Sequence, residues 1–189
     1  MKGRVFDEFC KYFMIFIGGI HGVGKSYLCV KINNHGFYTF SASKLISERK
    51  NFEFSDNKLI PDIEDNQRHL ISAISDINKR HKKYILEGHF CLLNSIGEVT
   101  RVPKETFLSL TPRAIIILKE CPSIIADRYK RRNHIESRIS NIKVFQDQEI
   151  TYAIEIAKAL NISYLIANGK SDFFTIIEFI KATYGKEEI

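Results

Sequence analysis

The sequence predicts an α/β protein of three layers, in which helices cover both faces of a five-stranded parallel sheet. Two observations support this prediction. Short apolar runs, typical of strands buried on both faces, alternate along the 189 residues with longer helical patterns. No linker rich in Pro, Gly or Ser and no internal repeat interrupts the alternation. We therefore expect one domain over residues 13–189, preceded by an extension of residues 1–12 to which we assign no role.

Three strands and two helices are expected in the first half of the chain, at 13–17, 25–33, 36–40, 62–80 and 84–87. The first run, Phe-Met-Ile-Phe-Ile, is wholly apolar and stops at two glycines, as a strand buried on both faces does. The stretch after Pro61 has apolar side chains mostly three and four residues apart, which predicts an amphipathic helix.

Two strands and three helices are expected in the second half, at 114–118, 122–132, 144–160, 163–167 and 172–184. Pro122 stands where a helix begins, because the fixed backbone angle of proline suits the first helical turn. Since strands and helices alternate throughout, successive βαβ units should build a parallel sheet.

Composition and charge exclude several classes of protein. The chain is 44% hydrophobic and 26% charged, an ordinary globular balance, and its net charge of +6 favours anionic partners. Four widely spaced cysteines without a Cys-x-x-Cys pair argue against a zinc ribbon and for a reduced, cytoplasmic protein. The apolar runs are far shorter than the ~20 residues that cross a membrane, and Asp7 and Glu8 interrupt any signal peptide.

A phosphate-binding loop is the strongest functional signal. Residues 19–26, Gly-Ile-His-Gly-Val-Gly-Lys-Ser, match G-x-x-x-x-G-K-[ST] between an apolar run and a predicted helix. Glycines let backbone N–H groups surround phosphate oxygens at the helix N-terminus. Lys25 would then reach the β- and γ-phosphates of ATP, and the Ser26 hydroxyl would bind Mg²⁺. A turn that needs glycine only for its backbone freedom is the competing interpretation. The expected nucleotide-binding residues are Gly19, His21, Gly22, Val23, Gly24, Lys25, Ser26 and Tyr27.

Two polar residues stand at the end of the third predicted strand. Parallel strands present catalytic groups at their carboxyl ends, so Glu87 is the candidate for organising Mg²⁺, directly or through water. His89 follows on a glycine turn, where it would contact the acceptor or position a water. The competing interpretations are a solvated strand-terminal glutamate and a structural histidine.

Basic residues gather in the predicted helix at 122–132 and just after it. Arg128 and Arg132 lie four residues apart on one helix face, and Arg138 follows. Arginines in such a place stabilise the charge of a transferring phosphoryl group. A solvated basic face near the helix C-terminus is the alternative. An acceptor would bind after the second strand, where the candidate residues are Ser43 and Arg49.

Taken together, the motifs resemble P-loop kinases of the nucleoside monophosphate kinase type, over roughly residues 13–184. Residues 127–132 are similar to the Asp-Arg-x-x-x-Arg stretch that opens the adenylate kinase lid. The resemblance implies a short lid at about 131–140, with its first arginine on the ATP base, its second on phosphate and Arg138 as the returning arginine. Where the family's acceptor-binding helix opens with Gly-Asp-Leu-Leu-Arg, residues 43–47 are Ser-Lys-Leu-Ile-Ser.

The Glu-Gly-His at 87–89 is similar to the Asp-x-His of the small nuclear adenylate kinases, which combine adenylate kinase and ATPase activity with a role in ribosome assembly. The leading hypothesis is a Mg²⁺- and ATP-dependent kinase that phosphorylates a small acceptor, a nucleoside monophosphate foremost. The alternative is an ATPase switch or assembly factor that acts with a protein or RNA partner. Phosphorylation of a nucleic-acid 5′ end ranks last. It needs a basic channel, whereas the Lys and Arg residues are spread along the chain apart from the cluster at 128–138. We do not favour a ring-forming ATPase, because it would need room for a separate helical domain at the C-terminus.

Overall fold

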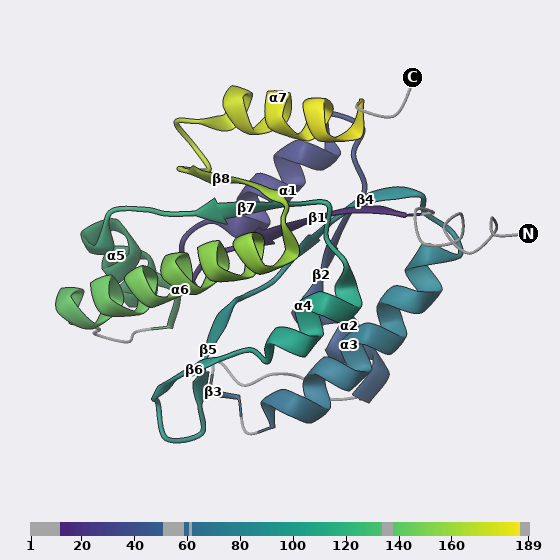
Figure 1. Ribbon diagram of the computed structural model, residues 1–189. Helices are drawn as coiled ribbons and strands as arrows, with labels where there is room; N and C mark the ends of the chain where they lie inside the picture. Colours follow the sequence, from purple (N-terminus) through teal and green to yellow (C-terminus); the bar gives the residue numbers. More distant parts are fainter. Residues whose placement is uncertain (1–11, 51–58, 61, 134–137, 186–189) are drawn as a thin grey trace, which may run out of the picture.

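A parallel sheet forms the centre of the protein, for which a computed structural model describes residues 12–50, 59–60, 62–133 and 138–185 (Figure 1). Its strand order is β2-β4-β1-β7-β8, so the predicted five-stranded parallel sheet and α/β class are confirmed. The strands are β1 (Phe13–Gly18), β2 (Thr39–Ser41), β4 (Lys83–Glu87), β7 (Ala114–Leu118) and β8 (Ser163–Ala167). Apart from Tyr12, the N-terminal extension lies outside the described residues.

Strand β1 is the central strand, and all six of its residues are buried. It pairs in parallel with β4 on one side and β7 on the other. This double pairing explains why its sequence has no polar position, since both faces of a central parallel strand pack against helices. The register sets Ile17 opposite Glu87, so the end of β4 lies beside the start of the phosphate-binding loop.

Helices cover both faces of the sheet: in Figure 1, α7 lies above it and α6 below it. The helices are α1 (Lys25–Asn33), α2 (Ala42–Lys50), α3 (Ile63–Asn78), α4 (Lys104–Leu110), α5 (Pro122–Asn133), α6 (Ile139–Leu160) and α7 (Phe173–Tyr184). The side chain of Asp62 caps α3 by accepting a hydrogen bond from the backbone N–H of Asp65 at 2.9 Å, three residues beyond it. That cap agrees with the predicted start of this helix.

Several elements differ from the prediction. Helix α6 begins at Ile139 instead of 144, because Ile142 and Phe145 continue its buried stripe toward the N-terminus. A second sheet of β3 (Leu59–Ile60), β5 (Cys91–Asn94) and β6 (Val99–Arg101) was not predicted, and neither were α2 and α4. The strands of this second sheet and α4 have two to seven residues, so their sequences contain too few turns or alternations to show a period.

Half of the predicted lid at 131–140 belongs to two helices. Residues 131–133 end α5 and residues 139–140 begin α6, while 134–137 lie outside the described residues.

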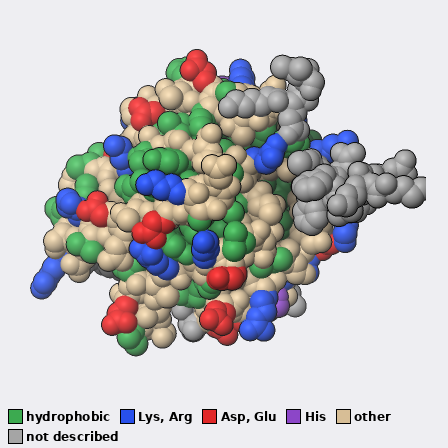
Figure 2. Space-filling model, in the orientation of Figure 1, with side chains coloured by type: hydrophobic (Ala, Val, Ile, Leu, Met, Phe, Trp, Pro, Cys, Tyr) green, Lys and Arg blue, Asp and Glu red, His purple; other side chains and the backbone are tan. Residues whose placement is uncertain are grey.

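On the face shown in Figure 2, Lys and Arg side chains are scattered among Asp and Glu. Among the helices that the structure describes, none has a stretch apolar and long enough to cross a lipid bilayer.

Candidate functional site

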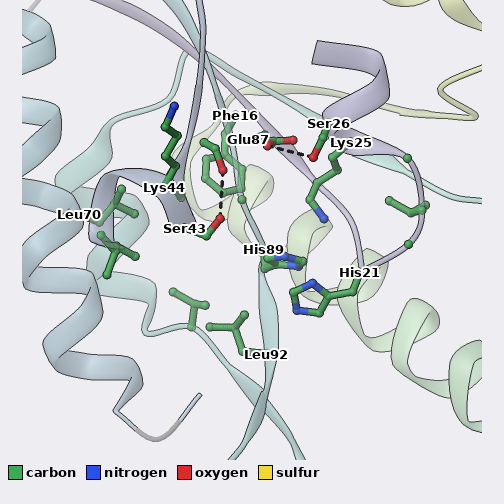
Figure 3. Close-up of a pocket in the computed structure, with 18 of the residues that line it drawn as sticks. Phe16, His21, Lys25, Ser26, Ser43, Lys44, Leu70, Glu87, His89 and Leu92 are labelled. Carbon is green, nitrogen blue, oxygen red and sulfur yellow. Dashed lines mark hydrogen bonds between the residues drawn. The ribbon is translucent and has the colours of Figure 1, made fainter. Parts of the chain in front are cut away.

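A cavity of about 1060 Å³ opens at the carboxyl ends of the sheet strands (Figure 3). The phosphate-binding loop and the start of α1 line one side of it. The opposite side, which we call the acceptor side, consists of the cavity-lining residues of α2, α3, β5 and α4. The turn after β4, with Gly88 and His89, lies between the two. This arrangement places two binding regions in one continuous space.

Glycines determine the shape of the phosphate-binding loop. Gly19, Gly22 and Gly24 all have positive φ, at 147°, 73° and 111°, where other residues are strained. A Cβ atom on Gly22 would also come within 2.7 Å of the Tyr129 ring. Backbone freedom is therefore one reason for these glycines, and the close approach of α5 is a second.

Lys25 lies over its own loop. Its Nζ donates hydrogen bonds to the carbonyl oxygens of Gly19, at 2.5 Å, and Ile20, at 3.2 Å. Burial lowers the pKa of Lys25 to about 8, although the carboxylates of Glu149 and Glu87 oppose that shift. A phosphate group entering the loop would replace these carbonyls as the partner of a charge that is already desolvated.

Ser26 and Glu87 form a pair of oxygen ligands. The Ser26 hydroxyl donates to Oε1 of Glu87 at 3.3 Å, and Oε2 of Glu87 is buried without a hydrogen-bond partner among the described residues. Oxygen donors of this kind are what Mg²⁺ prefers. The described part of the chain has no cluster of three or more His, Cys, Asp or Glu that could hold a metal. The pair could hold a Mg²⁺ ion only together with other ligands, such as phosphate oxygens and water.

Helix α5 holds the loop from outside through two neighbouring side chains. Arg128 donates through one guanidinium nitrogen to the carbonyls of Gly22, at 2.8 Å, and Val23, at 3.1 Å. Its other terminal nitrogen lies 3.0 Å from the carboxylate of Glu120, which follows β7. The Tyr129 hydroxyl donates to the carbonyl of His21 at 2.8 Å. In this structure Arg128 thus positions the loop, and its contact with an ATP base stays a prediction.

The structure brings some of the remaining candidates to the cavity. Tyr27 and Ser43 line it, and the Ser43 hydroxyl lies 3.1 Å from that of Ser41. The imidazole rings of His21 and His89 face each other with their centroids 4.1 Å apart, and Figure 3 shows them between Lys25 and Leu92. His89 therefore lies where the nucleotide and acceptor regions meet.

Two predicted arginines are not brought to the cavity, and a third cannot be placed. Arg49 points along α3, where its guanidinium bonds to Ser72 and to the carboxylate of Asp76. Arg138 is exposed at the N-terminus of α6 and does not line the cavity. The side chain of Arg132 lies outside the described residues. Arg49 thus joins two helices, which is the opposite of the acceptor contact that its position in the sequence suggested.

Glu149 is a site residue that the sequence analysis missed. It is fully buried on α6, and its Oε1 accepts hydrogen bonds from the backbone N–H groups of Gly19, at 2.8 Å, and Phe90, at 3.0 Å. Its Oε2 accepts a hydrogen bond from the backbone N–H of Cys91 at 2.5 Å. Burial raises the pKa of Glu149 to about 6, although these hydrogen bonds and the charge of Lys25 lower it. The sequence does contain one signal for this residue, because Glu149 interrupts the apolar stripe of a long helix.

Comparison with protein families identifies the chain, since the family model described as an AAA domain matches residues 18–146, from the end of β1 into α6. The chain belongs to this family. The AAA-domain match includes the whole phosphate-binding loop, Glu87 and Arg128, and it agrees with the predicted P-loop kinase-like group. Comparison with curated protein sequences finds no match.

A solved structure shares the fold of this AAA-domain protein. Shikimate kinase from Acinetobacter baumannii in complex with shikimate is similar with a TM-score of 0.58 and 11% identity, over 96% of this chain and 98% of that one. A gluconokinase from Sinorhizobium meliloti 1021 gives a TM-score of 0.48 and 13% identity, over 93% of each chain. The Mg²⁺ requirement, the likeness to adenylate kinases in particular and the cytoplasmic location stay predictions.

Proposed function

We propose that the protein binds ATP with Mg²⁺ at the phosphate-binding loop and transfers the γ-phosphoryl group to a small acceptor on the acceptor side. The continuous cavity is the observation that supports this proposal most directly. Nucleotide hydrolysis alone needs only a water molecule beside the phosphates, whereas this cavity extends from the loop to α2, α3 and α4. An ATPase switch has no use for such a second region.

The residues of the loop would do distinct tasks in this reaction. Lys25 would bind the β- and γ-phosphates, and Ser26 and Glu87 would hold Mg²⁺, which neutralises charge on the phosphates when bound. Arg128 would keep the loop in shape, with Arg132 and Arg138 as candidates for contact with the transferring group. Positioning and charge stabilisation are sufficient for catalysis here, so no covalent intermediate is required.

Several chemical classes of acceptor agree with the sequence. The resemblance to nucleoside monophosphate kinases favours a nucleoside monophosphate, which needs cations for its own phosphate. Arg49, the arginine nearest to the acceptor-binding stretch, is bound to Asp76 instead. The acceptor panel must therefore include uncharged compounds as well as nucleoside monophosphates and sugar acids.

The test is to incubate the purified protein with Mg²⁺, ATP and this panel, and to identify the products by mass spectrometry. A phosphorylated acceptor is expected, with turnover reduced at least about 100-fold in Lys25→Ala because a central phosphate contact is lost. Lys143→Ala, an exposed lysine paired with Asp147 on α6, is the matched control and should keep full turnover. Release of inorganic phosphate without any phosphorylated acceptor would replace this proposal by the ATPase alternative.

A further inference from the structure

The acceptor side is mostly apolar. Leu70 from α3, Leu92 from β5 and Phe107 from α4 line the cavity there, and Phe16 from β1 lines it as well, each at most 9% exposed. Figure 3 shows Leu70 and Leu92 across the cavity from Ser26 and Glu87. Such a surface binds a ligand by removing its apolar area from water, at roughly 25 cal/mol per Å². A compound made only of hydroxyl groups would gain little from it.

Neutral groups provide the buried polar atoms on this side. The Gln67 side chain is 8% exposed and lines the cavity, and its amide makes no hydrogen bond to another described residue. Its neighbour Asn66 accepts a hydrogen bond from Lys50 at 3.0 Å and is thus already engaged. Because Gln67 lines the cavity with an amide that no other described residue engages, it can both donate to and accept from a ligand bound there.

The described cations do not favour a charged acceptor. Lys44 lines the acceptor side, but it is 77% exposed and lies 4.0 Å from the carboxylate of Glu48, which lines the same cavity. Lys25 and Arg128 are bound to carbonyl oxygens of the phosphate-binding loop, and Lys170, which also lines the cavity, is exposed after β8. A carboxylate or phosphate placed among the apolar side chains would lose its hydration without gaining a fixed buried partner, and that is expensive.

From these three observations we infer that the acceptor is an uncharged alcohol with a ring body, apolar on its faces and carrying a hydrogen-bonding edge for Gln67. Nucleosides are the simplest class with this chemistry. The inference rests on the proposed function and narrows its substrate. In the reaction the acceptor hydroxyl oxygen bonds to the γ-phosphorus, the bond from that phosphorus to the β–γ bridging oxygen breaks, ADP leaves, and the hydroxyl proton passes to solvent.

The first experiment compares each common nucleoside with its own 5′-monophosphate, alongside shikimate and gluconate, at equal concentration with saturating Mg²⁺ and ATP. We expect at least one nucleoside to be phosphorylated about tenfold faster than every anionic compound. Faster transfer to a monophosphate or a sugar acid would overturn the acceptor class and leave the proposed function standing. ATP binding without transfer to any compound in the panel would overturn the proposed function as well.

The second experiment tests Gln67 itself. Gln67→Leu keeps the approximate size of the side chain and removes the amide, so it should raise the KM for the nucleoside about tenfold or more and leave the KM for ATP within twofold. Gln67→Glu adds a negative charge in the same shape and should also weaken nucleoside binding. Gln148→Leu, an exposed position on α6, is the matched control. An unchanged KM for the nucleoside in a folded Gln67→Leu protein would exclude this residue from acceptor recognition.

Discussion

Lys25 is bound to two carbonyl oxygens of its own loop, and its environment sets how the protein should respond to pH. Burial is the main cause that lowers its pKa from 10.5 to about 8. The folded protein therefore binds fewer protons than the unfolded chain between pH 8 and 10.5. The charge needed for phosphate binding is complete below pH 8 and is lost as the pH rises through that value.

We expect kcat/KM for ATP to fall above about pH 8, because this parameter reports the free enzyme. The kcat at saturating ATP should fall only at higher pH, since bound phosphates stabilise the charged lysine. Both profiles come from initial rates measured in overlapping buffers at constant ionic strength. A kcat/KM that stays level from pH 7 to pH 10 would contradict a lowered pKa for Lys25.

At the scale of the element, α5 shapes the nucleotide site by lining the cavity and by binding the loop. Arg128 and Tyr129 bind three successive carbonyls of the loop, those of His21, Gly22 and Val23. Burial raises the pKa of Tyr129 to about 12, so its hydroxyl remains a donor over the working range of pH. The helix and the loop thus form one unit, although about a hundred residues separate them in the chain.

Arg128→Ala should therefore raise the KM for ATP about tenfold, because the loop loses two of its hydrogen bonds to α5. The effect on the free energy of unfolding should be small, about 1 kcal/mol, since the ion pair with Glu120 is partly exposed. Steady-state kinetics and urea unfolding measure the two effects. Arg80→Ala, an exposed arginine beyond the end of α3, is the control. A KM equal to that of the control would mean that α5 is dispensable for the loop.

At the scale of the whole molecule, Glu149 connects three distant segments. Its carboxylate joins α6 to the first glycine of the phosphate-binding loop and to the turn between β4 and β5. Because burial raises its pKa from 4.5 to about 6, the folded protein takes up a proton before the unfolded chain does as the pH falls. Its ionised form opposes folding above pH 6, and this penalty is lost between pH 6 and 4.5.

Glu149→Gln should lower the free energy of unfolding at pH 7 by about 2 kcal/mol or more, because its amide nitrogen would face N–H donors instead of accepting from them. The difference in the free energy of unfolding between wild type and variant should grow by about 2 kcal/mol from pH 7 to pH 4.5. The wild type becomes more stable as the carboxyl group takes up its proton in the folded state. Urea unfolding at both pH values measures this difference. A difference that is the same at both would show that the pKa of Glu149 is ordinary.

The sequence by itself determined the five sheet strands, their parallel arrangement and the phosphate-binding loop with Lys25 and Ser26. These features depend on local signals: an apolar run, glycines at fixed spacing, a helix that follows at once. Glu87 could also be chosen, since strand ends in a parallel sheet meet at one edge.

Only the tertiary structure decided which other side chains line the cavity or support its loops. Glu149 bonds to Gly19 across 130 positions of sequence, and no local pattern encodes such a contact. The same holds for Gln67, which α3 brings to the acceptor side, and for Arg49, which packing against Asp76 turns away. A periodic pattern shows which face of a helix is buried, but the neighbour of that face depends on how distant segments pack, and here that packing sets the chemistry of the acceptor side.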